Sequence, residues 1–196
     1  EGTIFRLDYA NQIVAASLAG GVGATLTNGG ETLQQGLEFS GQFDSGVLFE
    51  SRHNVYLRTA YTWLPIAEFR GVRLSSVTPS ISVTGNRLPY VPETFTAATL
   101  GYSHPNGFDV FVENVYVGRQ FSDDLNTVDS TANGQRGAIP SQTYWNATAN
   151  YKIERWKTTL YVTAKNIFDR TFIVDRTRGI LPSGPQLFQA GAHIRF

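Results

Sequence analysis

Long segments that alternate between apolar and polar residues constrain this chain more than any other feature. The segment LQQGLEFSGQF at 33–43 places leucine and phenylalanine at odd positions and mostly polar residues at even positions. The segments 144–153 and 188–196 repeat the pattern. A period of two residues is that of a β-strand with one apolar and one polar face. The chain is therefore expected to be all-β.

The number and length of these segments favour a membrane. Weaker alternation marks 2–16, 54–64, 93–103, 108–119 and 157–167, which gives about eight strands of about ten or more residues. Strands of soluble proteins usually have about 5 to 6 residues, whereas membrane-spanning strands need about 9 to 11. With apolar faces toward lipid and polar faces inside, the pattern predicts an antiparallel up-and-down transmembrane β-barrel. Tyrosine and tryptophan near the predicted strand ends, among them Trp156, fit aromatic girdles at the two membrane interfaces.

The connections between the predicted strands alternate between short and long. The short ones are 45–53, 104–107 and 154–156, and the long ones, rich in Gly, Pro, Asn, Asp and Ser, are 17–31, 65–92, 120–141 and 169–184. Outer-membrane barrels have short periplasmic turns and longer extracellular loops. If the C-terminus lies in the periplasm, every long loop is extracellular.

Composition excludes several classes of function. Lys+Arg and Asp+Glu both number 16, so the chain lacks the excess of positive charge typical of nucleic-acid binders, and we expect no nucleic-acid partner. The absence of cysteine excludes disulfides and thiolate chemistry. The three histidines are far apart in sequence, and no nucleophile or metalloprotease motif is present, so we expect neither an enzyme, nor a metal site, nor a cofactor.

Several stretches resemble the C-terminal barrel region of TonB-dependent receptors of the ferric-siderophore and ferric-dicitrate type. These stretches are FRLDYANQIV at 5–14, TNGGETLQQGLEFSG at 27–41, AYTW at 60–63, GNRLPYVPE at 85–93, NGFDVFVENVYVGRQFSD at 106–123 and KNIFDRTFIVDRTRGILPSGP at 165–185. They occur in the order of the family and cover nearly the whole chain. The last stretch is the most specific.

The resemblance implies a cell outer-membrane receptor of a Gram-negative bacterium. Such a receptor binds a ferric siderophore or a ferric citrate-like chelate at its extracellular mouth and imports it with energy from the TonB complex. Its barrel has about 22 strands, so 1–196 is expected to be the C-terminal portion, with the plug domain and the TonB box absent from this chain. The chain does not begin with Met, which fits a piece of a longer protein. Within such a receptor, this chain is expected to supply barrel strands and extracellular ligand-binding loops.

Ligand-binding residues are expected in or beside the long loops. Ferric chelates are often anionic, and the arginine guanidinium offers a fixed fork of donors for carboxylates. The candidates are Arg119, Arg176, Arg178, Tyr116 and Gln120. Arg176 and Arg178 have the same parity along an extended segment and are expected to face the same way. The alternative for each arginine is a salt bridge with a loop aspartate: Asp123, Asp124 or Asp175.

The last strand carries an expected assembly signal. Phe196 and Ile194 resemble the terminal aromatic and alternating apolar residues that the barrel-assembly machinery recognises, although they also fit the lipid-facing side of a closing strand. Outer-membrane lipid is then a further partner. Two other architectures remain open at this point: a complete eight-stranded structural or adhesive barrel, and a soluble β-sandwich binding module.

Overall fold

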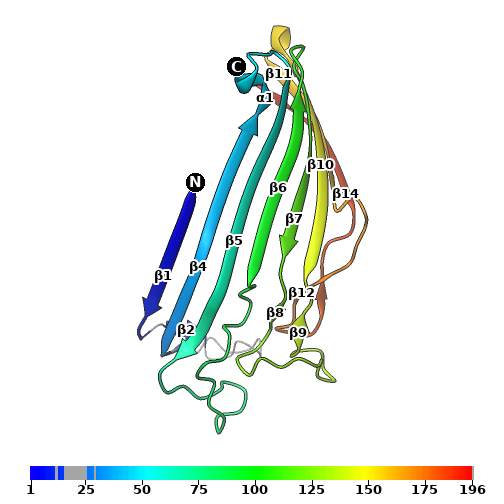
Figure 1. Cartoon of the computed structure of the whole chain (residues 1–196). Helices are drawn as coiled ribbons and strands as arrows, with labels where there is room; N and C mark the ends of the chain where they lie inside the picture. Colours follow the sequence, from blue (N-terminus) through cyan, green and yellow to red (C-terminus); the bar gives the residue numbers. More distant parts are fainter. Residues whose placement is uncertain (12, 16–25, 29, 196) are drawn as a thin grey trace.

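The chain forms one large antiparallel sheet. The computed structural model describes residues 1–11, 13–15, 26–28 and 30–195. Eight strands follow one another in space in the order of the chain (Figure 1). They are β1 (Gly2–Tyr9), β4 (Glu31–Asp44), β5 (Asn54–Arg70), β6 (Thr94–Ser103), β7 (Phe108–Val117), β10 (Gln142–Ile153), β11 (Thr158–Lys165) and β14 (Leu187–Ile194). The predicted antiparallel, up-and-down arrangement of about eight strands is confirmed.

The sheet is open and curved. Strands β1 and β14 form its two edges, and among the described residues they do not pair with each other (Figure 1). The described part of the chain therefore forms neither a closed eight-stranded barrel nor two large sheets packed face to face. Three two-stranded hairpins complete the fold: β2 (Ile13–Ala15) with β3 (Leu26–Asn28), β8 (Gln120–Phe121) with β9 (Ala138–Ile139), and β12 (Ile173–Asp175) with β13 (Leu181–Pro182).

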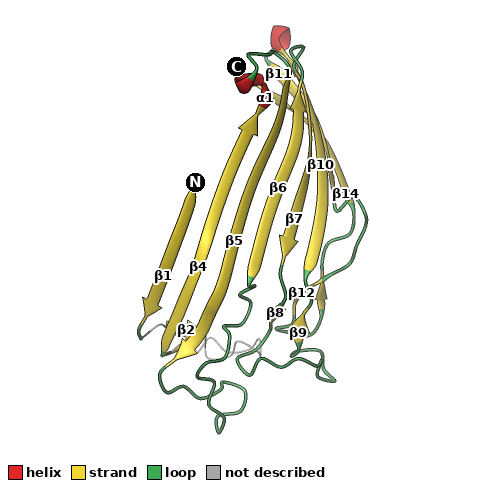
Figure 2. Ribbon diagram, in the orientation of Figure 1, coloured by secondary structure: helices red, strands yellow, loops and turns green. Residues whose placement is uncertain are grey.

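Short and long connections lie at opposite ends of the sheet, as the sequence predicted. The short-turn end carries the helix α1 (Ser45–Leu48), the turn 104–107 and the 3-10 turn η1 (Glu154–Trp156). The long loops and their small hairpins gather at the other end (Figure 2). Within the described residues, no helix is long and apolar enough to cross a membrane.

One face of the sheet is apolar across all strands from β4 to β14. Residues paired directly across neighbouring strands point to the same face. One such row consists of Phe43, Leu57, Leu100, Val112, Ala147, Ala164 and Phe188. Leu100 is 58% exposed and Phe188 is 66% exposed. A continuous exposed apolar surface of this kind is suited to lipid rather than to water.

The opposite face is polar and hydrogen-bonded. The carboxylate of Asp109 accepts hydrogen bonds from the Tyr56 hydroxyl (3.1 Å), the Ser103 hydroxyl (2.6 Å) and the Asn150 amide (3.2 Å). These residues come from β5, β6, β7 and β10 or adjoin their ends. Cross-strand hydrogen bonds satisfy a carboxylate that would otherwise be costly to shield from water. The polar face is therefore the inner face, and the apolar face is the outer face.

A glycine fixes how tightly β5 and β6 pack on the inner face. The Tyr56 ring lies directly over Gly101, its cross-strand partner. A Cβ atom added at Gly101 would lie only 2.2 Å from the Tyr56 Cζ atom. Only glycine leaves room for the ring, which brings the Tyr56 hydroxyl to Asp109.

An extra residue in β5 changes which side chains face inward in the final segment of the strand, next to the loops. Gln35 pairs with Ile66 and Leu37 pairs with Trp63, so three steps in β5 match two in β4. This β-bulge contains Pro65, which has no N–H to give to the ladder. Beyond it, Ala67 and Phe69 lie on the inner face. The predicted end of this strand at 64, with a loop over 65–92, is wrong, because the bulge lets the strand continue to Arg70.

Candidate functional site: the interlocked long loops

A small apolar core joins the end of β5 to the loop that follows it. Ala67 and Phe69, turned inward by the bulge, pack with Leu64, Val83 and Leu88. Phe69 is 2% exposed and Val83 is fully buried. The Phe69 and Leu88 backbone N–H groups donate to Asn86 (3.0 Å) and Ala67 (2.8 Å), which lays 85–88 against the strand. The loop 71–92 is therefore a folded unit on the inner side of the sheet.

Arg87 fastens this unit to the β5 bulge and to a second loop, 118–141, which joins β7 to β10. Its guanidinium donates to the carbonyls of Leu64 (2.8 Å), Val91 (3.0 Å) and Pro65 (3.3 Å). Its backbone N–H donates to Asn126 Oδ1 and its carbonyl accepts from Asn126 Nδ2, both at 2.8 Å. Burial lowers the pKa of Arg87, with the charge of Glu93 opposing the shift. An arginine pKa lies so high that the side chain stays charged.

Asp124 provides a second link between the same two loops. Its carboxylate is fully buried and accepts from the Ser75 hydroxyl (2.8 Å), the Ser76 backbone N–H (2.7 Å) and the Ser76 hydroxyl (2.9 Å). Its carbonyl accepts from the Asn86 side chain at 2.8 Å. Three donors from one turn can hold a carboxylate away from water.

Tyr90 joins the first two loops to a third loop, 166–186, which connects β11 to β14. Its backbone N–H donates to the Phe121 carbonyl (2.8 Å). Its hydroxyl accepts from the Arg176 backbone N–H (3.2 Å) and lies 3.4 Å from the Thr177 hydroxyl. Tyr90 has a φ of 57°, a left-handed conformation that is rare for a bulky residue. Burial raises the pKa of the Tyr90 hydroxyl, so it remains a neutral hydrogen-bonding group.

The Arg176 side chain links the third loop to the second. It is 3% exposed, and its guanidinium donates to the Gly134 carbonyl (3.1 Å) and the Ser130 hydroxyl (3.0 Å). Its Nε atom has no hydrogen-bond partner among the described residues. Arg176 forms no salt bridge in the described part of the chain. It acts there as a clamp between loops.

The other predicted ligand-binding residues lie in different surroundings. Arg119 is exposed, with its guanidinium carbon 5.4 Å from the centroid of the Phe121 ring. Arg178 is exposed in the turn between Thr177 and Gly179. Tyr116 is half-buried on β7, and Gln120 is buried at the start of β8.

Two of the sequence expectations about these arginines do not hold. Arg176 and Arg178 do not face the same way, because the chain turns between them and one is buried while the other is exposed. The alternative salt bridges to Asp123, Asp124 or Asp175 are not formed among the described residues. The loop aspartates bind neighbouring hydroxyl and backbone N–H groups instead. Ile194 lies on the outer face of β14, 54% exposed, and Phe196 lies outside the described residues.

Arg87, Asp124 and Tyr90 were not predicted as functional residues from the sequence. The DDLN sequence at 123–126 is a turn signal, but it does not name a partner. Their contacts with Asn86, Asn126 and Arg176 join residues that lie 38, 39 and 86 positions apart.

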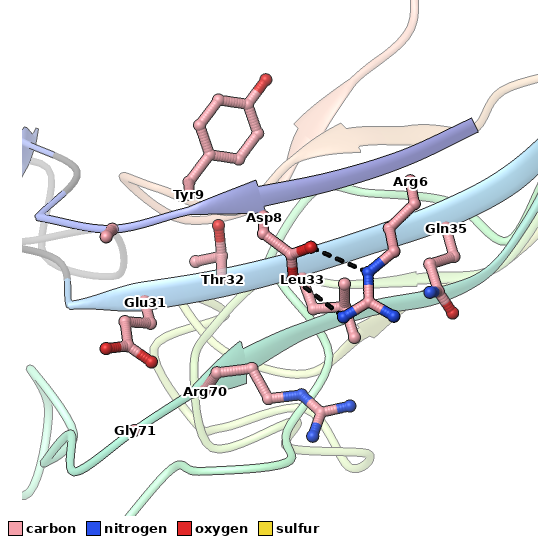
Figure 3. Close-up of a pocket in the computed structure, with 10 residues that line it drawn as sticks. Arg6, Asp8, Tyr9, Glu31, Thr32, Leu33, Gln35, Arg70 and Gly71 are labelled. Carbon is pink, nitrogen blue, oxygen red and sulfur yellow. Dashed lines mark hydrogen bonds and ion pairs between the residues drawn. The ribbon is translucent and has the colours of Figure 1, made fainter.

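A charged cavity of about 470 Å³ lies at the start of the first loop, where Gly71 is one of its lining residues (Figure 3). Arg6 and Asp8 form an ion pair at 2.7 Å within it, and Glu31 and Arg70 line its far side. The register of β1, β4 and β5 places these four side chains on the outer face, opposite Phe69. We therefore do not assign chelate binding to this cavity. No group of three or more His, Asp or Glu residues among the described residues is placed to hold a metal ion.

The sheet matches a known family of β-barrels. Residues 1–167 match the family described as "TonB dependent receptor-like, beta-barrel". The chain belongs to the TonB-dependent receptor β-barrel family. This confirms the resemblance seen in the sequence.

Solved structures of iron transporters and siderophore receptors share the fold. The ferric citrate transporter FecA in its unliganded form has a TM-score of 0.70 and 24% identity, with 97% of this chain and 28% of FecA covered. The siderophore receptor PiuA from Acinetobacter baumannii has a TM-score of 0.67 and 18% identity, with 98% and 26% covered. The FrpB iron transporter from Neisseria meningitidis has a TM-score of 0.66 and 14% identity, with 97% and 28% covered. The chain thus spans about a quarter of each.

Proposed function

We propose that this chain is part of an outer-membrane receptor that takes up a ferric siderophore or a related iron chelate. The family match over residues 1–167 carries the proposal. The similar structures, a ferric citrate transporter and a siderophore receptor, point to the same cargo. Within the receptor, the eight strands would form the C-terminal portion of the barrel, and the three interlocked loops would form one side of the ligand mouth.

Two arginines at the loops are the proposed contacts for an anionic chelate. Arg119 and Arg178 are exposed, so a carboxylate or catecholate oxygen can reach their guanidinium groups. Arg176 and Gln120 are buried and would support the binding surface from behind. The register of β7 places Tyr116 on the outer face with Val112, so no ligand contact is proposed for it. Charge-assisted hydrogen bonds to a guanidinium are among the strongest that a protein can offer an anion.

The remaining partners follow from the same proposal. A plug domain and a TonB box, outside this chain, would couple uptake to the TonB complex. The barrel-assembly machinery would recognise the end of β14 through Ile194 and Phe196. Outer-membrane lipid would cover the apolar face.

A binding titration on the complete receptor tests the function. Intrinsic tryptophan fluorescence is followed while ferric citrate, a ferric hydroxamate and a ferric catecholate are added separately. We expect at least one chelate to quench the signal saturably. Failure of every chelate in a broad panel would contradict the uptake function.

A double variant tests the assigned contacts. Arg119→Ala with Arg178→Ala should raise the Kd of the bound chelate about tenfold or more, since a hydrogen bond to a charged group contributes about 1.5–3 kcal/mol. Arg52→Ala, an exposed arginine in a periplasmic turn, is the matched control and should leave the Kd unchanged. An unchanged Kd in the double variant would reject these two contacts while leaving the uptake function standing.

A further inference from the structure

The periplasmic turn between β10 and β11 gathers positive charge around an exposed tryptophan. Trp156 is 65% exposed, and its neighbours Arg155 and Lys157 are also exposed. The Arg195 backbone N–H donates to the Lys157 carbonyl at 3.0 Å, which brings a third exposed cation beside the turn. Lys157 adopts a left-handed φ of 48°, which makes the reversal tight.

These three cations have no anionic partner in the described structure. The nearby acidic residue Glu154 is paired with Lys152 at 2.5 Å. Among the described residues, the side chains of Arg155, Lys157 and Arg195 form none of the ion pairs. The chain as a whole has a formal net charge of +0, so this turn is a local concentration of positive charge.

The turn continues the lipid-facing surface. Tyr151, Leu160 and Ala192 form one cross-strand row of the outer face. Ile194 lies one step closer to the turn and is 54% exposed. Tryptophan favours the boundary between hydrocarbon and headgroups, and Arg and Lys extend from that depth toward lipid phosphates. Arg155 and Lys157 therefore lie at headgroup level beside Trp156, and Arg195, the first residue after β14, lies at the same depth.

We propose that Arg155, Trp156, Lys157 and Arg195 form a docking surface for an anionic phospholipid headgroup of the periplasmic leaflet. The charge complements a lipid with a net negative headgroup better than a zwitterionic one. Trp156 packs at the glycerol level while the cations bind the phosphate. This surface is independent of chelate binding at the other end of the barrel.

A site-specific probe measures which lipid lies at the turn. The complete receptor carries 5-fluorotryptophan at position 156 and is placed in nanodiscs of mixed phosphatidylglycerol and phosphatidylcholine. A nitroxide is attached at the same acyl position in either lipid. We expect the phosphatidylglycerol label to broaden the fluorine signal several-fold more than the phosphatidylcholine label, since each cation near a surface favours anionic lipid by about fivefold. Equal broadening by the two labels would overturn the proposal.

Variants and salt separate the charge effect from general membrane contact. The triple variant Arg155→Gln, Lys157→Gln and Arg195→Gln should lose the preference and leave only the broadening common to both lipids. Arg52→Gln in another periplasmic turn should retain it. In the unaltered receptor, the preference should fall as salt is raised from low to about 0.5 M, because screening shortens the reach of surface charges. A preference that survives both the triple variant and the added salt would reject the assignment.

Discussion

Arg87 is the residue on which the loop arrangement depends most directly. Its guanidinium satisfies three backbone carbonyls at the β5 bulge and beside it, while its own backbone is bound by Asn126. Arg87→Ala should leave these carbonyls without donors, at a cost of about 1–3 kcal/mol for each that stays buried. We expect faster hydrogen exchange and faster proteolysis in 71–92. Arg52→Ala should change neither, and Arg87→Lys should restore little because a single ammonium cannot replace the fork.

Asp175 makes the third loop sensitive to acid. Burial acts to raise the pKa of Asp175, but hydrogen bonds from Thr177 and Tyr90 outweigh it, and the net pKa is lowered. A lowered carboxyl pKa stabilises the fold above the unfolded value of about 3.9 and loses that contribution as the pH falls through the folded value. Protection of the 173–178 amides, measured as the exchange rate relative to the intrinsic rate at each pH, should therefore fall below about pH 4. Asp175→Asn should exchange faster at pH 7 and lose most of this pH dependence; an acid response as large as that of the unaltered chain would contradict the assignment.

At the scale of elements, local pattern predicted the strands and long-range contacts determined the loops. The alternation at 33–43 depends only on which residues lie two apart, so it is visible in the sequence. The continuation of β5 to Arg70 was missed because Pro65 is a turn signal unless a bulge accommodates it. The burial of Arg176 was missed because its contacts with Gly134 and Ser130 join residues 42 and 46 positions apart.

Asp124 tests whether the first two loops form one unit. Asp124→Asn replaces a carboxylate oxygen by an amide donor that would face the hydroxyl and N–H donors of Ser75 or Ser76. We expect hydrogen exchange to increase in both 71–80 and 120–127, because the two segments lose the same link. Asp129→Asn, at an exposed position in the same loop, is the control. An increase confined to one segment would show that the loops open separately.

At the scale of the whole molecule, the two sheet edges determine how the isolated chain behaves. Within the part of the chain that the structure describes, β1 and β14 each have one neighbouring strand. One side of each strand therefore presents unpaired backbone groups, which promote edge-to-edge association. In detergent, the isolated 196-residue chain should form dimers or larger species whose fraction grows with concentration, as measured by light scattering. Amide protection in β1 and β14 should grow with concentration, whereas protection in β6, paired on both sides, should stay constant. A concentration-independent monomer would contradict this expectation.

The bulge at Pro65 gives β5 two different environments along its length. Before the bulge in the sequence, Leu57 and the other odd positions face the lipid. After the bulge, the odd position Phe69 packs in the loop core. When loops are exchanged between related proteins, the face to which each residue of the strand end points must therefore be preserved, as well as the loop length. A transplanted loop that begins after Arg70 inherits a strand end that already points Phe69 inward, while one that begins before Leu64 must carry its own extra residue. Without that residue, the donor's core residues would face the lipid and its charges would face the mouth.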